Sequence, residues 1–390
     1  MRVAVVGAGV CGLATARALQ DLGVRDLVVL DARHPGAGSS GLSVGMVETQ
    51  YLSEADIAVR AYGRRYYDAM ESEHGLRFVR DGYLRTAHDA SDVASYEASV
   101  QRQLACGVPD AEVLTSAEIA RRWPQLLVGD LAGGLFGPSD GHIDGYEFCA
   151  LTARLIRDGG GRVLTGTSLV DARVDPSGWR LVTEGGDVEA DVVVNAAGPW
   201  AGVVGELLGA PVPLVPQLHG AVVIQLAQPV NRPLPFVMDY LPGSARSGVY
   251  FRPERPDQLI AGLHVEEVVA DAVSPDVTLG RVPASVVEEL VDRLTERLRV
   301  TDGAAVTHSW TGIYPMTPDH RPIVGRHPLR DDVVCAVGAG GNGIQLAPAI
   351  GRVAAEAVLG TPTRTFLDRD PHWEATRLTQ PALGSPLHHS

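Results

Sequence analysis

A glycine-rich turn between two apolar strands constrains this chain more than any other feature. Residues 2–6 form an apolar, β-branched run that suits a parallel strand buried on both faces, and the sequence Gly-Ala-Gly-Val-Cys-Gly follows over residues 7–12. A short helical pattern comes next, and a second strand over 27–30 ends in Asp31, nineteen residues after Gly12. This order predicts a Rossmann-type dinucleotide site, in which a helix N-terminus faces the pyrophosphate and the acid accepts hydrogen bonds from a ribose.

Two further glycine-rich segments lie far from the first. Residues 192–198 read as an apolar strand followed by Asn-Ala-Ala-Gly, and residues 338–343 are Gly-Ala-Gly-Gly-Asn-Gly. Glycine lets the backbone approach a ligand closely because it has no Cβ. A nicotinamide cofactor usually requires only the first segment, so three such segments favour FAD held along most of its length. Asp31 also disfavours a cofactor that carries a 2′-phosphate.

A helix is expected to begin directly after Asn342 and Gly343. The free amides at a helix N-terminus stabilise negative charge, which a flavin carries at its pyrimidine end once it is reduced. The alternative is an ordinary glycine-rich turn between a strand and a helix, and the N-terminal fingerprint favours the functional interpretation.

The composition excludes several functional classes. The chain of 390 residues is long enough for two domains, and its net charge of −14 argues against a nucleic-acid partner. No apolar run approaches the length of a membrane span, and the first strand begins at residue 2, so we expect neither a span nor a signal peptide. Four scattered cysteines favour a reducing, cytoplasmic compartment. The chain has no lysine, which excludes Schiff-base chemistry, and no histidine spacing typical of a metal site.

The cofactor segments alternate with β-rich stretches along the chain. The fold class we predict is α/β, with a discontinuous Rossmann-type FAD-binding domain and an α+β substrate domain built on an antiparallel sheet. The first domain comprises residues 1–75, 140–215 and 305–378, the second comprises residues 76–139 and 216–304, and residues 379–390 are expected to be a disordered tail. Helical periodicity predicts helices over 54–73, 90–106, 145–157, 283–299 and 344–359. Apolar runs predict strands over 162–174, 179–183, 188–194 and 333–337.

Four segments make the chain similar to the FAD-dependent amine oxidoreductase family, which includes D-amino-acid oxidase, glycine oxidase and sarcosine oxidase. They are residues 7–31, 38–45, 312–319 and 340–351, and they are spread over nearly the whole chain. Residues 41–45, 248–251 and 345–348 most resemble the sarcosine/dimethylglycine dehydrogenase-like branch. The resemblance implies hydride transfer from the carbon beside a neutral amine to flavin N5, which leaves an imine.

The fingerprint and the resemblance together place a set of residues at the cofactor. These are Gly7, Gly9, Val10, Cys11, Gly12, Asp31, Ala32, Arg33, Ser39, Ser40, Ser43, Val44, Gly45, Met46, Val170, Ala197, Gly198, Gly312, Gly338, Gly341, Asn342, Gly343, Ile344 and Gln345. The resemblance also implies that Tyr250 and Tyr314 face the substrate and that His264 lies near the reacting amine. As a lone histidine after a strand, His264 is alternatively a structural residue.

Two departures from the family bear on the substrate and the cofactor. Sarcosine oxidases hold the substrate carboxylate with an arginine and a lysine, and these positions are Glu48 and Gln345 here. Glu48 either attracts a cationic group of the substrate, or it pairs with a nearby arginine or faces solvent. The positions of flavin-linking cysteine and histidine residues in relatives fall at Gly312 and near Ser43, so we expect FAD to be bound non-covalently.

The leading interpretation is an FAD-dependent enzyme that oxidises a primary or secondary amine and passes electrons to oxygen or another acceptor. A second is an FAD-dependent 2-hydroxyacid dehydrogenase, which would require a cationic carboxylate clamp. A third is a flavin-bearing assembly or scaffold protein without turnover. Bleaching of the flavin by an amine in the absence of oxygen distinguishes the first from the other two.

Overall fold

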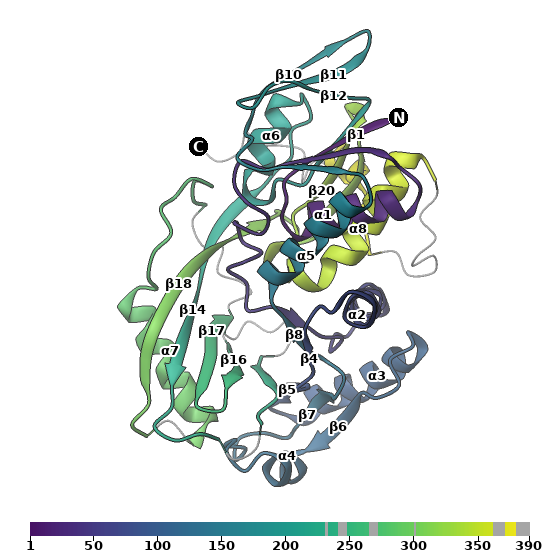
Figure 1. Ribbon diagram of the computed structural model, residues 1–390. Coiled ribbons are helices and arrows are strands. Elements are labelled where there is room, and N and C mark those ends of the chain that lie inside the picture. Colours follow the sequence, from purple (N-terminus) through teal and green to yellow (C-terminus); the bar gives the residue numbers. More distant parts are fainter. Residues whose placement is uncertain (231–232, 241–247, 265–271, 300–301, 362–370, 380–390) are drawn as a thin grey trace.

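Two large sheets organise the computed structural model, which describes residues 1–230, 233–240, 248–264, 272–299, 302–361 and 371–379 (Figure 1). The first sheet has six strands in the order β19-β20-β13-β1-β2-β9. Its strands are β1 (Arg2–Val6), β2 (Asp26–Leu30), β9 (Arg162–Leu164), β13 (Val192–Asn195), β19 (Ile323–His327) and β20 (Arg330–Val337). Neighbouring strands are parallel, except that β19 runs antiparallel to β20.

The six-stranded sheet is buried on both faces. One face carries the helices α1 (Val10–Asp21), α5 (Gly145–Asp158) and α8 (Gly343–Leu359). The other carries α6 (Ala201–Leu207) and a three-stranded sheet of β10 (Leu169–Asp175), β11 (Gly178–Thr183) and β12 (Val188–Ala190). Along β1, Val3 and Val5 pack into the first cluster, while Ala4 and Val6 pack with Trp179 in the second. Since both faces are covered, the strand reads as a continuous apolar run in the sequence.

The second large sheet has eight strands in the order β18-β14-β17-β16-β15-β5-β7-β6. Its strands are β5 (Tyr83–Ala87), β6 (Glu112–Thr115), β7 (Gly133–Gly137), β14 (Val215–Gln225), β15 (Phe236–Asp239), β16 (Gly248–Arg255), β17 (Gln258–His264) and β18 (Ala305–Met316). Neighbouring strands are antiparallel except β5 and β15, whose parallel pairing joins two distant segments of the chain. Helix α7 (Ala284–Arg297) packs on this sheet through Leu290 and Leu294, and α3 (Ala90–Ala105) and α4 (Ser116–Arg122) lie near its other end.

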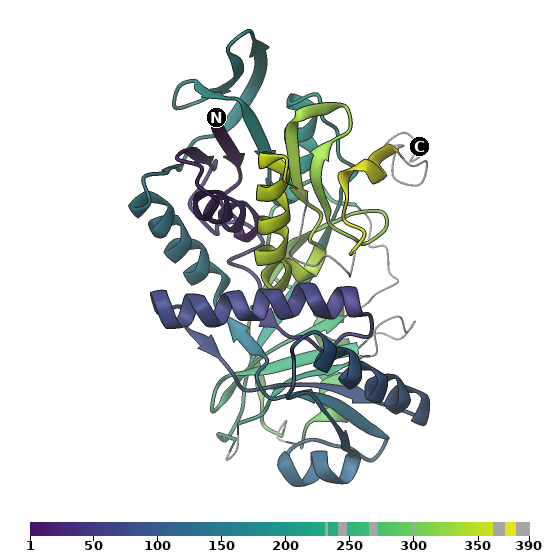
Figure 2. The same ribbon diagram turned by 90° about the vertical axis from the view of Figure 1, so that its right-hand side faces the viewer.

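Helix α2 (Glu54–His74) and a small sheet join the two halves. The helix crosses the middle of the molecule between the two large sheets (Figure 2). It meets α8 at Gly63, where a Cβ would collide with the carbonyl oxygen of Gln345. The small sheet has the order β3-β8-β4 and consists of β3 (Met46–Val47), β8 (Gly141–Ile143) and β4 (Phe78–Val79). Short 3₁₀ helices cover Gly198–Trp200, Gly340–Asn342 and Ala375–Thr379.

The predicted α/β fold class is confirmed, and the five predicted helices correspond to α2, α3, α5, α7 and α8. Two predicted strands are wrong in extent. The strand predicted over 162–174 is divided near Gly166, whose φ of 61° turns the chain from β9 in one sheet to β10 in another. The strand predicted over 188–194 is divided at Asp191, whose carboxylate accepts a hydrogen bond from the backbone N–H of Arg2 at 2.7 Å. The apolar pattern continues through both switches, so it does not reveal them.

The division of the chain into two domains stays a prediction. Strand β18, which we assigned to the FAD-binding segments, pairs with β14 from Met316 to Ala305 and so lies in the eight-stranded sheet. Of the predicted tail, Thr379 ends a 3₁₀ helix, and residues 380–390 lie outside the described residues. In the described part of the chain, none of the helices combines the length and the apolar character that crossing a bilayer requires.

Candidate cofactor and substrate site

A cavity of about 800 Å³ lies where the two large sheets meet, and all three glycine-rich segments line it. Ligand cavities of several hundred Å³ hold molecules of cofactor size. Strands β14, β16 and β18 of the eight-stranded sheet supply another part of the wall. The predicted site residues in the wall are Gly7, Gly9, Val10, Cys11, Asp31, Ala32, Arg33, Ser39, Ser40, Ser43, Val44, Ala197, Gly198, Tyr250, Gly312, Tyr314, Gly341, Gly343 and Ile344.

The first glycine turn is shaped by backbone contacts that leave no room for side chains. Gly7 has a φ of 110°, and a Cβ there would collide with the carbonyl oxygen of Ala196 in the second glycine segment. A Cβ at Gly12 would collide with the carbonyl oxygen of Gly7. Helix α1 starts at Val10 with no acidic residue in its first turn, so its N-terminus favours an anion such as a pyrophosphate.

Asp31 is fixed beside this turn by two backbone amides. Its Oδ2 accepts a hydrogen bond from Ala8 N–H at 2.7 Å, and its Oδ1 accepts one from Arg33 N–H at 2.8 Å. Each carboxylate oxygen has a second lone pair, so both can also accept from ribose hydroxyls. The apolar residues Leu169 and Leu207 line the cavity near Asp31, where β10 packs against α6. This end of the cavity therefore suits an adenosine.

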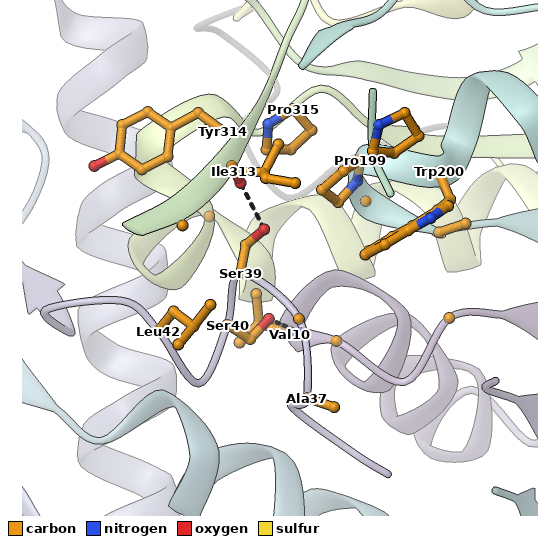
Figure 3. A pocket seen from close by; sticks show the side chains of 18 of the residues that line it. Val10, Ala37, Ser39, Ser40, Leu42, Pro199, Trp200, Ile313, Tyr314 and Pro315 are labelled. Atoms are coloured by element: carbon orange, nitrogen blue, oxygen red, sulfur yellow. Dashed lines mark hydrogen bonds between the residues drawn. The ribbon is translucent and has the colours of Figure 1, made fainter. Parts of the chain in front are cut away.

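The loop that carries Ser39 and Ser40 spans the cavity between its two ends. Ser40 Oγ accepts a hydrogen bond from Val10 N–H at 3.1 Å, and Ser39 Oγ donates one to the carbonyl of Ile313 on β18 at 2.6 Å (Figure 3). The indole Nε1 of Trp310 donates to the carbonyl of Leu42 at 2.8 Å. The loop is thus tied both to the α1 N-terminus and to the eight-stranded sheet.

The N-terminus of α8 forms the opposite end of the wall. Gly341, Gly343 and Ile344 line the cavity, and a Cβ at Gly341 would overlap the ring of Tyr314. Beneath them, Asn342 Oδ1 accepts hydrogen bonds from Tyr51 Oη at 3.1 Å and from Gln345 Nε2 at 2.7 Å. Gln345 is fully buried, and among the described residues its Oε1 has no hydrogen-bond partner. Gln345 supports the turn but does not itself line the cavity.

A histidine that the sequence did not single out lies at this end of the cavity. The rings of His219 on β14 and Tyr314 on β18 stack, with centroids 3.8 Å apart and an interplanar angle of 15°. The Nε2 atom of His219 is buried and has no hydrogen-bond partner among the described residues. Burial lowers the pKa of His219 to about 4, with a smaller contribution from His264. A neutral imidazole whose Nε2 has no described hydrogen-bond partner therefore belongs to the cavity wall.

Tyr250 lies beside this pair, on strand β16. It is buried, and a Cβ on Gly262 of the neighbouring strand would collide with its hydroxyl oxygen. Burial raises its pKa well above the usual range, so the hydroxyl stays protonated. The stacked ring of Phe236, with centroids 6.0 Å apart, fixes the ring of Tyr250 from the side of the sheet.

Glu48 and His264 lie outside the cavity wall. Glu48 is buried and its Oε1 is 3.4 Å from an Arg85 guanidinium nitrogen. Burial raises the pKa of Glu48, and the charges of Arg85 and Arg60 oppose that rise. This geometry matches the second interpretation of Glu48, in which it pairs with an arginine, and a contact with substrate stays a prediction. His264 contacts the ring of Tyr240 with centroids 4.4 Å apart, and burial lowers its pKa to about 4.

Several other predicted residues support the wall without forming it. The complete set outside the wall is Gly12, Gly45, Met46, Glu48, Val170, His264, Gly338, Asn342 and Gln345. A Cβ at Gly45 would collide with the carbonyl oxygen of Ile143, so this glycine serves chain packing. Val170 is 49% exposed and directly follows Leu169, which lines the cavity.

The sequence reasoning missed a second set of wall residues. They are Leu42, Thr167, Ser168, Leu169, Trp200, Val203, Val204, Leu207, His219, Gly220, Ala221, Pro275, Asp276, Val277, Leu279, Trp310, Ile313 and Pro315, among others. Trp200 follows the second glycine segment by two residues, and that position was an available signal. His219 and residues 275–279 follow no spacing rule: the pairing of β14 with β18 brings His219 to the cavity, and hydrogen bonds to those two strands hold the segment that contains residues 275–279.

The wall fits a dinucleotide that carries a flavin ring at the end opposite its adenosine. A glycine cradle and a helix N-terminus stand at the Asp31 end, and a second helix N-terminus with a stacked His–Tyr pair stands at the other. Glycines that a Cβ would block allow a ligand to lie directly on backbone at both ends. These features are those that FAD requires along its length.

Comparisons with known proteins agree with this arrangement. A sequence model of the family described as "FAD dependent oxidoreductase" matches residues 2–357. Human mitochondrial sarcosine dehydrogenase is 27% identical over 374 residues, which are 93% of this chain but only 40% of that protein. Glycine oxidase from Geobacillus kaustophilus is 27% identical over 365 residues, 91% of this chain and 92% of that one. The crystal structure of L-proline dehydrogenase from P. horikoshii shares the fold, with a TM-score of 0.83 and 24% identity, over 95% of this chain and 96% of that one.

Proposed function

The chain belongs to the family of FAD-dependent oxidoreductases, and from this premise we propose that it oxidises a C–N bond of a primary or secondary amine to an imine. FAD, when bound, supplies the hydride acceptor, its N5 atom. Sarcosine, glycine and L-proline, which appear in the names of three relatives, all carry an amine. The chain spans less than half of the sarcosine dehydrogenase it matches, so the substrate of that enzyme does not identify the substrate of this chain.

The stacked pair of His219 and Tyr314 carries this proposal. An amine carbon can give up a hydride only if its nitrogen keeps a free electron pair, so the site must hold the amine in its neutral form. His219 is neutral at pH 7 because burial lowers its pKa to about 4, and its Nε2 lacks a partner among the described residues. The atom is enclosed by its neighbours, so an amine N–H that reaches it after a small movement of the wall would satisfy it and orient the nitrogen. The aromatic walls of Tyr250 and Tyr314 exclude water and so favour an uncharged amine.

The charges of the wall bear on the class of amine. In the described part of the wall, the side chains that carry a full charge are Asp31, Arg33 and Asp276, and all three belong to the end that suits the adenosine. At the other end the wall offers His219, Tyr250, Tyr314 and Trp310, none of which is a cation. A carboxylate buried there would meet no counter-charge from the described residues of the wall. We therefore favour N-alkyl amines without a carboxylate over amino acids.

Anaerobic bleaching of the flavin absorbance tests the proposal. The purified protein with FAD would be mixed with an N-methylated amine, the same amine carrying a carboxylate, L-proline and a 2-hydroxy acid. Bleaching by an amine is expected, and the carboxylate-free compound should bleach faster than its carboxylate partner. Bleaching by the 2-hydroxy acid and by none of the amines would overturn the proposal in favour of a hydroxyacid dehydrogenase. Admitting oxygen after bleaching then shows whether oxygen accepts the electrons.

A further inference from the structure

A segment from the antiparallel half of the molecule forms part of the cofactor cavity. Residues 272–283 precede helix α7, and Pro275, Asp276, Val277 and Leu279 among them line the cavity. Leu279 is 36% exposed although it is apolar. On the Rossmann side, Trp200 lines the same part of the cavity from the 3₁₀ helix that follows β13. The 272–283 segment and Trp200 therefore face each other from the two halves of the molecule.

Both ends of the 272–283 segment are fixed to the eight-stranded sheet. At one end, Val273 N–H donates to the carbonyl of Pro216 at 2.8 Å. At the other, Gly280 exchanges hydrogen bonds with Thr311 on β18 at 2.9 and 3.0 Å, and Val282 N–H donates to Ser309 Oγ at 3.2 Å. Strand β18 is the edge strand of that sheet, so these bonds attach the segment along the open edge of the sheet. The anchors leave residues 274–279 as a short span between two fixed ends.

One described hydrogen bond ties the middle of this span to the Rossmann half. The indole Nε1 of Trp200 donates to Asp276 Oδ1 at 2.7 Å. The guanidinium of Arg33 lies over the Trp200 ring, with its Cζ 5.1 Å from the ring centroid. A Cβ at Gly38 would lie 3.6 Å from Arg33 and 3.9 Å from Trp200, so the loop before Ser39 also reaches this point. Three segments of the Rossmann half and the 272–283 segment thus converge on the Trp200 ring.

The convergence lies over the part of the cavity that suits the adenosine and the pyrophosphate. Arg33 follows Asp31 in the chain, and Asp31 Oδ1 accepts from Arg33 N–H. Tyr314, at the ring end, lies on the other side of the Ser39 and Ser40 loop from Trp200 (Figure 3). A cofactor lying on the first glycine turn is enclosed between Trp200 and the 272–283 segment when their hydrogen bond is made.

We propose that the hydrogen bond between Trp200 and Asp276, which we call the clasp, retains FAD by closing the 272–283 segment over its adenosine half. Release of the cofactor then requires the clasp to open, because the walls on either side belong to different halves of the molecule. FAD is expected to be held without a covalent bond, so its retention depends on contacts of this kind. The clasp is exposed to solvent, so its contribution is modest, and breaking it should speed release about fivefold.

The test measures FAD release from the holoprotein. Gel-filtered protein is diluted into buffer containing enough potassium bromide to make wild-type release measurable, and free FAD is separated by ultrafiltration at timed intervals. Trp200→Phe removes the donor but keeps an aromatic ring beside Arg33, and Asp276→Ala removes the acceptor. Each is expected to speed release about fivefold, and the double variant should be no faster than either single variant because the two changes break one bond.

Two control variants separate the clasp from other effects. Asp276→Asn keeps a carbonyl acceptor and should release FAD within about twofold of wild type. Asp158→Ala removes an exposed acid at the end of α5, outside the cavity wall, and should not change release. Thermal melting of the wild-type apoprotein and of the five variant apoproteins checks that folding is intact. Wild-type release rates in Trp200→Phe and Asp276→Ala would overturn the clasp, and so would equal acceleration by Asp276→Asn and Asp276→Ala.

Discussion

The two halves of the molecule contribute to the cavity in different ways. On the Rossmann side the wall is mainly backbone, and its glycines are required because a Cβ at Gly7 or Gly12 would meet a carbonyl oxygen. On the side of the eight-stranded sheet the wall is mainly side chains, such as His219 and Trp310, which strand pairing brings together. The cofactor is thus held by a shape that many chemistries can share, while we expect the reaction to depend on a few side chains that can be exchanged without altering the fold.

The largest effect is expected from adding one methyl group on the Rossmann side of the cavity, where the wall is mainly backbone. Gly12→Ala places a Cβ against the carbonyl oxygen of Gly7. The carbonyl must therefore move, and the turn that joins β1 to α1 must move with it. We expect destabilisation by about 3 kcal/mol and loss of FAD from the purified protein. Urea unfolding and the flavin absorbance of purified protein measure the two effects. The matched control is Gly129→Ala, where an added Cβ meets nothing within 4 Å. A Gly12→Ala protein that retains FAD and is as stable as wild type would contradict the claim that the backbone of this turn requires glycine.

On the side of the eight-stranded sheet, replacing a single side chain should leave the fold intact and impair the reaction. His219→Leu keeps an apolar side chain beside Tyr314 but removes the unpaired Nε2. We expect FAD to remain bound and the rate of anaerobic flavin bleaching by the best amine to fall about 100-fold. The control is His74→Leu at the C-terminal end of α2, outside the cavity wall. An unchanged bleaching rate in His219→Leu would show that the stacked pair only shapes the cavity.

The smallest effect concerns a charged cluster that holds α7 on the eight-stranded sheet. Asp239 accepts from Arg297 Nε at 2.9 Å and lies 2.8 Å from His88 Nε2. The hydrogen bond to Asp239 raises the pKa of His88, so its stabilising contribution is present in full below about pH 6.5 and is lost as pH rises through the raised pKa.

Between pH 5.5 and 9, wild type should therefore lose about 0.5–1 kcal/mol more unfolding free energy than His88→Gln, a figure that allows for the partial exposure of His88. The same cluster lowers the pKa of Asp239 to about 2, so the contribution of Asp239 persists at pH 5.5 and is lost only in stronger acid. Urea unfolding at the two pH values measures the difference. Equal losses in the two proteins would show that His88 does not couple to the sheet.

The contrast between the halves also explains what the sequence could predict. The turn from Gly7 to Asp31 follows from backbone geometry, and the same constraint reveals the segments around Gly198 and Gly341. His219 gives no such signal, because a histidine in a strand shows neither its neighbours nor its pKa until β14 pairs with β18. The resemblance to a known family identified Tyr250 and Tyr314, which residue patterns alone did not. Switches between sheets, as at Asp191, are hidden because the apolar pattern continues through them.

The parallel pairing of β5 with β15 has a consequence for how the protein is made. Strand β5 (Tyr83–Ala87) is synthesised long before β15 (Phe236–Asp239). The edge of β5 that pairs with β15 therefore stays unpaired on the nascent chain until β15 emerges from the ribosome. The other sheet waits longer, since β20, which flanks β13, spans Arg330–Val337. Neither sheet can be completed on the nascent chain before β18 and β20 have been synthesised, and exposed strand edges invite pairing with other chains. Newly synthesised chains therefore carry unpaired strand edges, which favour aggregation, until these two strands have emerged.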